Sequence, residues 1–528
     1  MIKLLTIFCC IVCFSFLKST PNRCVEGFAN NRDRPELDTF YLSESGHFKI
    51  HYDINNDNGN IPPQEDIDED GVPDYIESVA EIAEESRDVL VNIMGYLPEP
   101  PDDEEGVYDI YVRDQNAWGY NWVNTTEGWS YITIDNDYPD DEFESAFCLN
   151  MIDKMKISVA HEFFHAIQRS YRLPIGDHDF FLEMSSMWFE DLMVPDCNEY
   201  LDDKWIRNLS YTIFNNPTQQ FDGGDLSVNQ SSANFGYSMA LFGHYLSRVI
   251  DEKGMIDEFN STIMREIWED YSTSSDIGGL NAAGASIKNV VENISKEPFS
   301  QAWSDFISSN MLCGQLDLFN DIYYYPDQQL IAPIVVGQSD LLQPNSIDNI
   351  DIDLEYNSAS ISSSLSLANM YLDFEISDIS DISGYYVVKG LSSDRGRISN
   401  SASDILINTG GLFSFVFSPK IEDVNVNAEI TSTPVPLTQV INVYPNPLSV
   451  NNDLYIDIES SDNVLNYNIK IYDTLGRCLH KFDYENLQLG LNEKIVVPIT
   501  ELDIASGIYF VEISISDNQF FSKIVLIK

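Results

Sequence analysis

One short motif, His161-Glu162-Phe163-Phe164-His165, constrains this chain most, because its residues can act together only on a helix. The surrounding sequence, MKISVAHEFFHAIQRSYR, is helical in pattern and mostly apolar. Residues four apart share one helix face, so both imidazoles can meet one metal ion. Glu162 follows the first histidine, where its carboxylate can act on a water molecule at that ion. Zinc suits imidazole and lowers the pKa of bound water, so the motif predicts a zinc site on a buried helix.

A third protein ligand is needed, and its position separates the classes of zinc peptidase. The metzincin pattern places Gly and His where this chain has Gln168 and Tyr171, so that class is excluded. Downstream, the segment FFLEMSSMWFEDLM is again helical in pattern. It carries Glu183, and Glu190 lies two turns further along the same face.

This second segment resembles the helix of gluzincin peptidases, in which a "NEGxAxxxE"-like sequence supplies a glutamate ligand. By that resemblance Glu183 is the third zinc ligand, and Glu190 is a supporting or alternative acid beside it. Leu182 and Met184 replace the Asn and Gly of the family segment. HEFFHAIQ, the Trp/Glu segment and YSMALFGHYL together resemble a family of secreted bacterial gluzincin-type metalloproteases over residues 40–330.

The resemblance also implies a role for a tyrosine and a mode of cleavage. In related gluzincins a tyrosine on a later helix donates a hydrogen bond to the oxyanion of the tetrahedral intermediate. Tyr237, in NFGYSMALFGHYL, is the position that best matches it. Glu162 would be the general base. The GxMEN motif of aminopeptidase N-like gluzincins is missing from the sequence before the HEFFH helix, which favours an endopeptidase.

A second metal site is predicted from DIDEDGVPDYIE (66–77), which matches a twelve-residue calcium loop. Gly71 stands at the sixth position, where the chain of such a loop turns sharply. The residues expected to supply oxygen ligands or loop carboxylates are Asp66, Asp68, Asp70, Val72, Asp74 and Glu77. Because Pro62 and Pro63 precede the loop, no entering helix is expected, and the Ca²⁺ would be structural.

Several assignments stay open from the sequence alone. The weaker alternatives are His178 as a zinc ligand, and Asp53-Asn55-Asp57 or the acidic loop from Asp135 to Glu144 as further cation sites. The cysteines beyond the N-terminal apolar run are widely spaced and form no metal-binding pattern. Cys148 with Cys197 or Cys313 are candidates for a disulfide, and the spacing does not choose between them.

Both ends of the chain carry export signals. Met1-Ile2-Lys3 precedes the apolar run LLTIFCCIVCFSFL, which is typical of a secretory signal peptide, assigned to residues 1–20. No later apolar run is long enough to span a bilayer. At the other end, four segments resemble the C-terminal sorting domain of the type IX secretion system, so residues 436–528 would bind that machinery. They are YPNP (444–447), IKIYDTLGR (469–477), SGIYFVEI (506–513) and KIVLIK (523–528).

The net charge of the chain limits the kinds of molecule that it can bind. Lys and Arg total 29 against 85 Asp and Glu, which gives a formal net charge of −56. Nucleic acid and anionic lipid both need basic surface, so neither is expected as the main partner. Part of the acid belongs to the predicted calcium loop, and the remainder is expected to be solubilising surface in a salty medium.

The sequence pattern changes along the chain and predicts a multidomain α+β fold. Alternating runs at 47–54, 107–114 and 129–137 predict strands, whereas helical patterns dominate from 155 to 330. The expected parts are an N-terminal strand, calcium loop and helix (21–106), a gluzincin-like zinc peptidase domain with a mixed sheet and a mainly helical lower half (107–335), and two β-sandwich-like domains (336–435 with a linker, and 436–528).

These features predict a secreted zinc-dependent endopeptidase that acts on protein or peptide substrates and holds a structural Ca²⁺. The main alternative is a catalytically inert surface adhesin or glycan-binding protein on a gluzincin-like scaffold, in which residues 336–430 would bind the ligand. A third hypothesis is a hydrolase that acts on a non-protein amide or ester.

Overall fold

The computed structural model contains two compact units, each with its own hydrophobic core. The large unit comprises residues up to 343 with 347–367 and 372–431, and the small unit comprises 344–346, 368–371 and 432–528. The structure describes residues 25–28 and 34–527 apart from single residues or pairs and from 56–58, 102–105, 125–127, 140–144, 174–178, 203–208, 227–229, 315–326, 335–339, 461–463 and 489–491. The predicted signal peptide lies outside the described residues.

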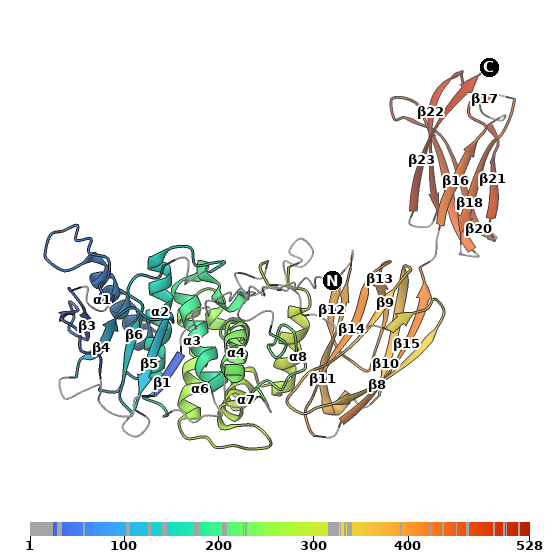
Figure 1. The fold of residues 1–528 in the computed structure, drawn as a ribbon. Helices are drawn as coiled ribbons and strands as arrows, with labels where there is room; N and C mark the ends of the chain where they lie inside the picture. The colour runs from blue at the N-terminus through green and yellow to red at the C-terminus, as the bar shows by residue number, and fades with distance from the viewer. Residues whose placement is uncertain are drawn as a thin grey trace, which may run out of the picture. The chain divides into compact units, whose positions relative to one another are not determined.

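A six-stranded mixed sheet forms the first layer of the large unit (Figure 1). In spatial order its strands are β1 (Val25–Phe28), β5 (Gly119–Val123), β6 (Ser130–Ile134), β4 (Tyr108–Val112), β3 (Phe48–Tyr52) and β2 (Thr39–Leu42). β3, β4 and β6 run parallel, β5 is antiparallel to β6, and β1 runs parallel to β5. β4 and β6 are buried along their whole length, as central parallel strands usually are.

Two helices, α1 (Asp74–Arg87) and α2 (Met151–Gln168), pack on this sheet, and α3 (Asp179–Met193) packs on α2. α1 continues into the π-helical turn η1 (Asp88–Ile93). The Asn150 side chain caps α2 by accepting a hydrogen bond from the Asp153 N–H at 2.8 Å. Phe163 of α2 packs edge-on against Phe48 of β3, which explains why the middle of α2 is buried between the sheet and α3.

Further helices complete the large unit's helical part. They are α4 (Gln230–Ser238), α5 (Ala240–Tyr245), η5 (Leu246–Ile250), α6 (Ile263–Tyr271), α7 (Ala282–Ser295) and α8 (Phe299–Asn310). α4 approaches α3 closely at Gly236, where an added Cβ atom would lie 2.4 Å from the Phe180 carbonyl oxygen. Gly243 of α5 similarly lies against Trp188 of α3. These two glycines therefore allow α4 and α5 to pack directly on α3, the helix that carries Glu183.

Two further sheets belong to the same large unit. One has the order β13 (Ser401–Ile407), β10 (Met370–Ile376), β15 (Val424–Pro434) and β8 (Ile347–Leu354). The other has the order β12 (Asp394–Arg397), β11 (Ile382–Lys389), β14 (Leu412–Pro419), β9 (Ser360–Ser366) and β7 (Asp340–Leu342). β11 and β14 pack on α8, and Val387 and Val416 are buried in the same core as the helices. The sequence placed a domain boundary at 335/336, whereas the contacts join both sides of it in one compact unit.

The small unit consists mainly of strands among the residues described. A three-stranded sheet has the order β16 (Thr438–Tyr444), β18 (Leu454–Ser460) and β21 (Asn492–Val497). A five-stranded sheet has the order β17 (Leu448–Ser449), β23 (Asn518–Ile527), β22 (Gly507–Ile515), β19 (Val464–Tyr472) and β20 (Cys478–Gln488). Ile456, Ile469 and Val511 are among the residues of its core, which gives this unit an apolar interior of its own.

A disulfide joins Cys148 and Cys197. Cys148 precedes the start of α2 and Cys197 follows the end of α3, so the bond ties α2 and α3 together at these ends. Cys313, the other candidate partner of Cys148, is buried and unbonded. The sequence left this choice open because pairing depends on how α2 and α3 pack.

Candidate metal centre

The two helices α2 and α3 bring the predicted zinc ligands together. One ligand atom from each of His161, His165 and Glu183 lies within 4.8 Å of the others. Glu183 Oε2 is 3.1 Å from His161 Nε2 and 3.6 Å from His165 Nε2. The two imidazoles are fully buried and Glu183 is nearly so, hence the cluster is shielded from bulk water. A donor set of two imidazoles and one carboxylate matches catalytic zinc sites.

The orientation of His165 is set by Gln168, one turn further along α2. Gln168 Nε2 donates to the Leu182 carbonyl and to Ser186 Oγ, which turns Gln168 Oε1 toward His165 Nδ1 at 3.0 Å. Because an amide oxygen only accepts, His165 carries its proton on Nδ1 and keeps the Nε2 lone pair. His165 Nε2 is buried and has no hydrogen-bond partner among the described residues, as expected for an atom that would ligate a metal.

His161 is oriented by a carboxylate instead. Its Nδ1 donates to Glu190 Oε2 at 2.7 Å, which leaves Nε2 toward Glu183. Burial alone would lower the pKa of His161, but its hydrogen bonds with Glu183 and Glu190 outweigh burial and raise the pKa to about 10. Burial opposes ionisation of Glu183, yet His165 and His161 lower its pKa to about 2. The buried acids thus favour a cation at this position.

Glu162 lies under β5, a strand that was not predicted from the sequence. An added Cβ at Gly119 would be 2.7 Å from Glu162 Cγ, so only glycine leaves room for this side chain. Asn121 Nδ2 donates to the Glu162 carbonyl oxygen at 3.1 Å and thereby ties β5 to α2. The pKa of Tyr120 is raised by partial burial and by the charge of Glu162, which places its hydroxyl within electrostatic reach of that carboxylate.

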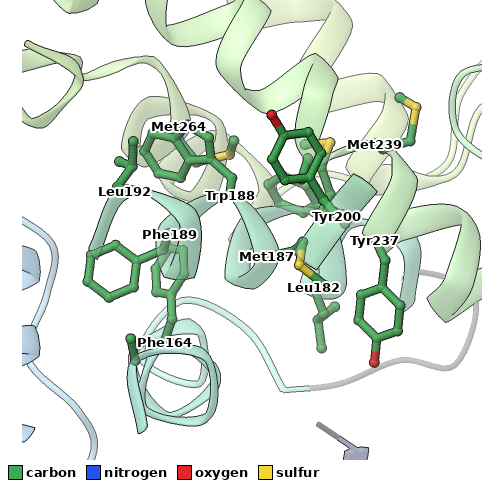
Figure 2. Close-up of a cluster of buried hydrophobic side chains, with 14 of the residues drawn as sticks. Phe164, Leu182, Met187, Trp188, Phe189, Leu192, Tyr200, Tyr237, Met239 and Met264 are labelled. Atoms are coloured by element: carbon green, nitrogen blue, oxygen red, sulfur yellow. The ribbon is translucent and has the colours of Figure 1, made fainter. Parts of the chain in front are cut away.

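Tyr237, on α4, lies beside the imidazoles. Its ring centroid is 6.1 Å from that of His161, and the side chain is buried. Figure 2 shows its hydroxyl directed away from the apolar side chains of Met187 and Met239. The same view shows Phe164 of α2 reaching toward Phe189 of α3, and these rings are 5.4 Å apart. The tyrosine implied by the resemblance is therefore close to the candidate metal centre.

The predicted calcium loop also has a defined geometry. Asp66 Oδ2 accepts from the Gly71 N–H at 3.0 Å, and Asp70 Oδ1 accepts from the Val72 N–H at 2.8 Å. Carboxylate oxygens of Asp66, Asp68 and Asp70 lie within 4.8 Å of one another. Gly71 has φ +95°, a conformation that favours glycine.

The end of the acidic loop runs into α1. Asp74 opens the helix, and its Oδ1 accepts from the Ile67 N–H at 3.1 Å. The pKa of Glu77 is raised by desolvation and by the nearby Asp68 and Asp70 carboxylates, which places Glu77 within reach of the loop. The two ends of the predicted loop are therefore adjacent.

The weaker candidates are placed only in part. His178, Asp57 and residues 140–144 lie outside the described residues. Asp53 is buried and accepts hydrogen bonds from the Asp38 N–H and from Asn60 Nδ2. Burial raises the pKa of Asp135 to about 7, and its carboxylate accepts backbone N–H groups of its own loop. Both aspartates are accounted for by hydrogen bonds that shape the chain locally.

Comparison with known protein families identifies the small unit. Residues 442–528 match the family described as "Secretion system C-terminal sorting domain". This confirms the predicted sorting domain, which directs export by the type IX system. The protein is therefore secreted or held at the cell surface. Among the described residues no helix is both long and apolar enough to cross a membrane.

The other comparisons are weak, and the search of curated proteins finds no match. Solved structures that align in part include a β-glucuronidase from Parabacteroides merdae (10 % identity, 32 % of this chain and 28 % of that chain, TM-score 0.14). IMPa from Pseudomonas aeruginosa, solved with an O-glycopeptide, aligns at 14 % identity over 36 % of this chain and 23 % of its own (TM-score 0.14). Tripeptidyl peptidase 2 aligns at 8 % identity over 39 % and 32 % (TM-score 0.16). This chain thus spans about a third or less of each of these proteins.

Proposed function

We propose that the large unit is a zinc-dependent endopeptidase. The observation that carries the proposal is the convergence of His161, His165 and Glu183, with each imidazole oriented by a different hydrogen-bond acceptor. Incidental buried histidines do not need ligand atoms that face one another, and burying such a cluster without a cation is costly. The resemblance of residues 40–330 to gluzincins agrees with this proposal.

The residues around the cluster suit hydrolysis. Zinc, when bound by His161, His165 and Glu183, supplies a Lewis acid that polarises a carbonyl and makes water more acidic. Glu162, beneath β5, accepts a proton from the attacking water and delivers it to the leaving amine. Tyr237 donates a hydrogen bond to the oxyanion as it forms. Glu190 and Gln168 hold the two imidazoles in place throughout.

Zinc content and cleavage measured together test this proposal. The chain from residue 21 is purified, its zinc is quantified, and digestion of reduced, carboxymethylated casein is compared with that by Glu162→Gln. We expect about one zinc per chain in both proteins and cleavage by the wild type only. If the wild type holds zinc but shows no cleavage that Glu162→Gln abolishes, the peptidase proposal is overturned and the inert adhesin is favoured. Hydrolysis restricted to small esters or amides would favour the third hypothesis, a hydrolase of a non-protein amide or ester.

We also propose that the loop of residues 66–77 binds a structural Ca²⁺. Its support is the set of converging oxygens of Asp66, Asp68 and Asp70, together with the turn at Gly71. The ion would fix the connection between β3 and α1, since α1 packs on both β3 and α2. Calcium at this site would therefore support the sheet and the α2 helix from a distance.

A further inference from the structure

Strand β1 occupies the edge of the sheet nearest Glu162. It pairs parallel with β5, and its four residues lie opposite β5 from Val25↔Tyr120 to Phe28↔Val123. The other neighbour of β5 is β6, so β5 would be an edge strand without β1. An edge strand presents unpaired N–H and C=O groups, which is the surface that an extended peptide uses when it adds to a sheet.

The position of β5 makes this edge important. Gly119, at the start of β5, contacts Glu162, and Asn121 is hydrogen-bonded to the Glu162 carbonyl. An extended peptide added along β5 would therefore run beside the general base. β1 takes that place in the structure and is visible as the blue strand beside β5 in Figure 1.

β1 is also a strand that can be displaced. It has only four residues, VEGF, and both Glu26 and Gly27 are of types that are depleted in strands. A parallel pairing is slightly less stable per residue than an antiparallel one. In the sequence, β1 follows shortly after the predicted signal peptide, 1–20.

We infer that β1 is an autoinhibitory strand, which covers the edge of β5 where an extended polypeptide substrate binds. Its release, by displacement or by proteolysis of the N-terminal segment, opens that edge. The control of peptidase activity by β1 rests on the proposed function, but pairing of β1 or of a peptide with the edge of β5 can be measured without any hydrolysis. If the edge is open about a tenth of the time, removal of β1 strengthens substrate binding about tenfold.

The test compares the zinc-loaded chain from residue 21 with one from residue 34, both carrying Glu162→Gln so that nothing is cleaved. Fluorescein-labelled, reduced and carboxymethylated α-lactalbumin serves as the extended polypeptide, and its Kd is measured by anisotropy. Hydrogen exchange is followed at β5 (Gly119–Val123) and, as the internal control, at β6 (Ser130–Ile134). We expect the shorter chain to bind about tenfold tighter and to exchange faster at β5 alone.

Two variants show whether the effects come from the loss of β1 or from misfolding of the shorter chain. The double variant Glu26→Pro/Phe28→Pro keeps the chain length, removes two backbone N–H groups of β1, and should reproduce both effects. Glu26→Ala keeps the backbone and should change neither. Unchanged exchange at β5 in both the shortened and the double-proline chain would overturn the inference, and so would equal Kd values.

Activity separates this inference from the proposed function. With Glu162 restored, the chain from residue 34 should show a KM about tenfold lower and an unchanged kcat, because β1 competes with substrate and does not alter chemistry. If neither chain cleaves casein while the Kd and exchange results hold, the peptidase proposal fails and a covered peptide-binding edge remains. An active enzyme with the same KM in the chains from residues 21 and 34 would overturn the inference that β1 is autoinhibitory.

Discussion

At the scale of single residues, the two imidazoles of the candidate metal centre have different hydrogen-bond acceptors. Glu190 accepts from His161, whereas the neutral amide of Gln168 accepts from His165. The sequence indicated Glu190 but not Gln168, which it used only to exclude the metzincin class. A third buried histidine, His244, lies between Asp191 at 3.2 Å and Glu258 at 3.0 Å. Residues next to each other on α3 thus serve two separate buried histidines.

Replacing Gln168 should weaken the metal site. Gln168→Ala removes the acceptor that keeps the proton on His165 Nδ1, so we expect zinc affinity to fall about 10- to 100-fold, measured by competition with a chelator. Gln115→Ala is the control, because Gln115 is a partly buried glutamine whose side chain donates to the carbonyls of Ala117 and Thr133, away from the cluster. Equal zinc affinity in the two variants would contradict this role for Gln168.

Replacing His244 should destabilise the fold in a pH-dependent way. Burial opposes its charge, but Glu258 and Asp191 outweigh burial and raise the pKa to about 10, above the ordinary value of about 6.5. Charged His244 therefore stabilises the fold fully below about pH 6.5, and this contribution is lost as pH rises through about 10.

We expect His244→Gln to cost on the order of 3 kcal/mol near pH 6, since two buried carboxylates lose their cation. The deficit should shrink toward pH 10, as measured by urea denaturation across this range. His47→Gln is the control, because His47 is only partly buried and its pair with Glu84 is worth about 1 kcal/mol or less. A deficit that grows with pH would contradict the assigned sign.

At the scale of elements, the position of β5 over α2 decides what can happen at Glu162. The contact between Gly119 and Glu162 joins β5 to α2, the helix that carries His161 and His165. Likewise, the acidic loop of residues 66–77 runs directly into α1, which packs on β3 of the sheet. Each candidate site thus depends on one turn or strand that fits against a helix.

Adding a methyl group to β5 should impair catalysis before it impairs metal binding. In Gly119→Ala the new Cβ displaces Glu162, and because a misplacement of about 1 Å can cost about 100-fold, we expect kcat to fall about 10- to 100-fold. Zinc content should not change. Gly507→Ala is the control, since its added Cβ would have ordinary contacts of 3.6 Å or more. Normal kcat in Gly119→Ala would contradict the packing of β5 on Glu162.

Removing calcium should lower the Tm of the wild type only. In EGTA the Asp66, Asp68 and Asp70 carboxylates repel one another without the ion, so Tm should fall, and adding back Ca²⁺, but not Mg²⁺, should restore it. Asp70→Ala should already have the lower Tm and respond little to EGTA. Asp88→Ala, an acid outside the loop, serves as the control. The same EGTA response in Asp70→Ala would exclude this loop.

At the scale of the whole molecule, the first pair of sandwich-forming sheets is part of the large unit. Arg395 lies over the Tyr385 ring at 3.9 Å and forms an ion pair with Asp305 of α8. Ser300 of α8 is hydrogen-bonded to Ser383 of β11 at 2.9 Å. The small unit has its own core, as befits a domain that acts in export.

Truncation at two positions tests this division. A chain of residues 21–431 should keep the Tm of the large unit, whereas one of 21–335 exposes the face of α8 that packs on β11 and β14. Exposure of a few large apolar side chains costs on the order of 5 kcal/mol, so we expect Tm to fall by roughly 10 °C or more. Calorimetry of the two chains measures this, and equal Tm values would show that the sheets contribute nothing to the helical part.

The sequence determined the features that depend on local spacing. Imidazoles four residues apart on an apolar helix, acids at alternate positions around Gly71, and four motifs in order at the C-terminus are all visible without coordinates. For the same reason β3, β4 and β6 were predictable from alternation or from continuous apolar runs.

Only the tertiary structure decided which distant segments meet. β5 contains Gly119 and Asn121, two residue types that are depleted in strands, and was not predicted from the sequence, yet the sheet places Gly119 against Glu162. The pairing of Cys148 with Cys197, the turn of Gln168 toward His165, and the joining of β11 to α8 likewise arise from packing between elements. Such contacts follow from burial and hydrogen-bond satisfaction across the chain, which periodicity along it does not encode.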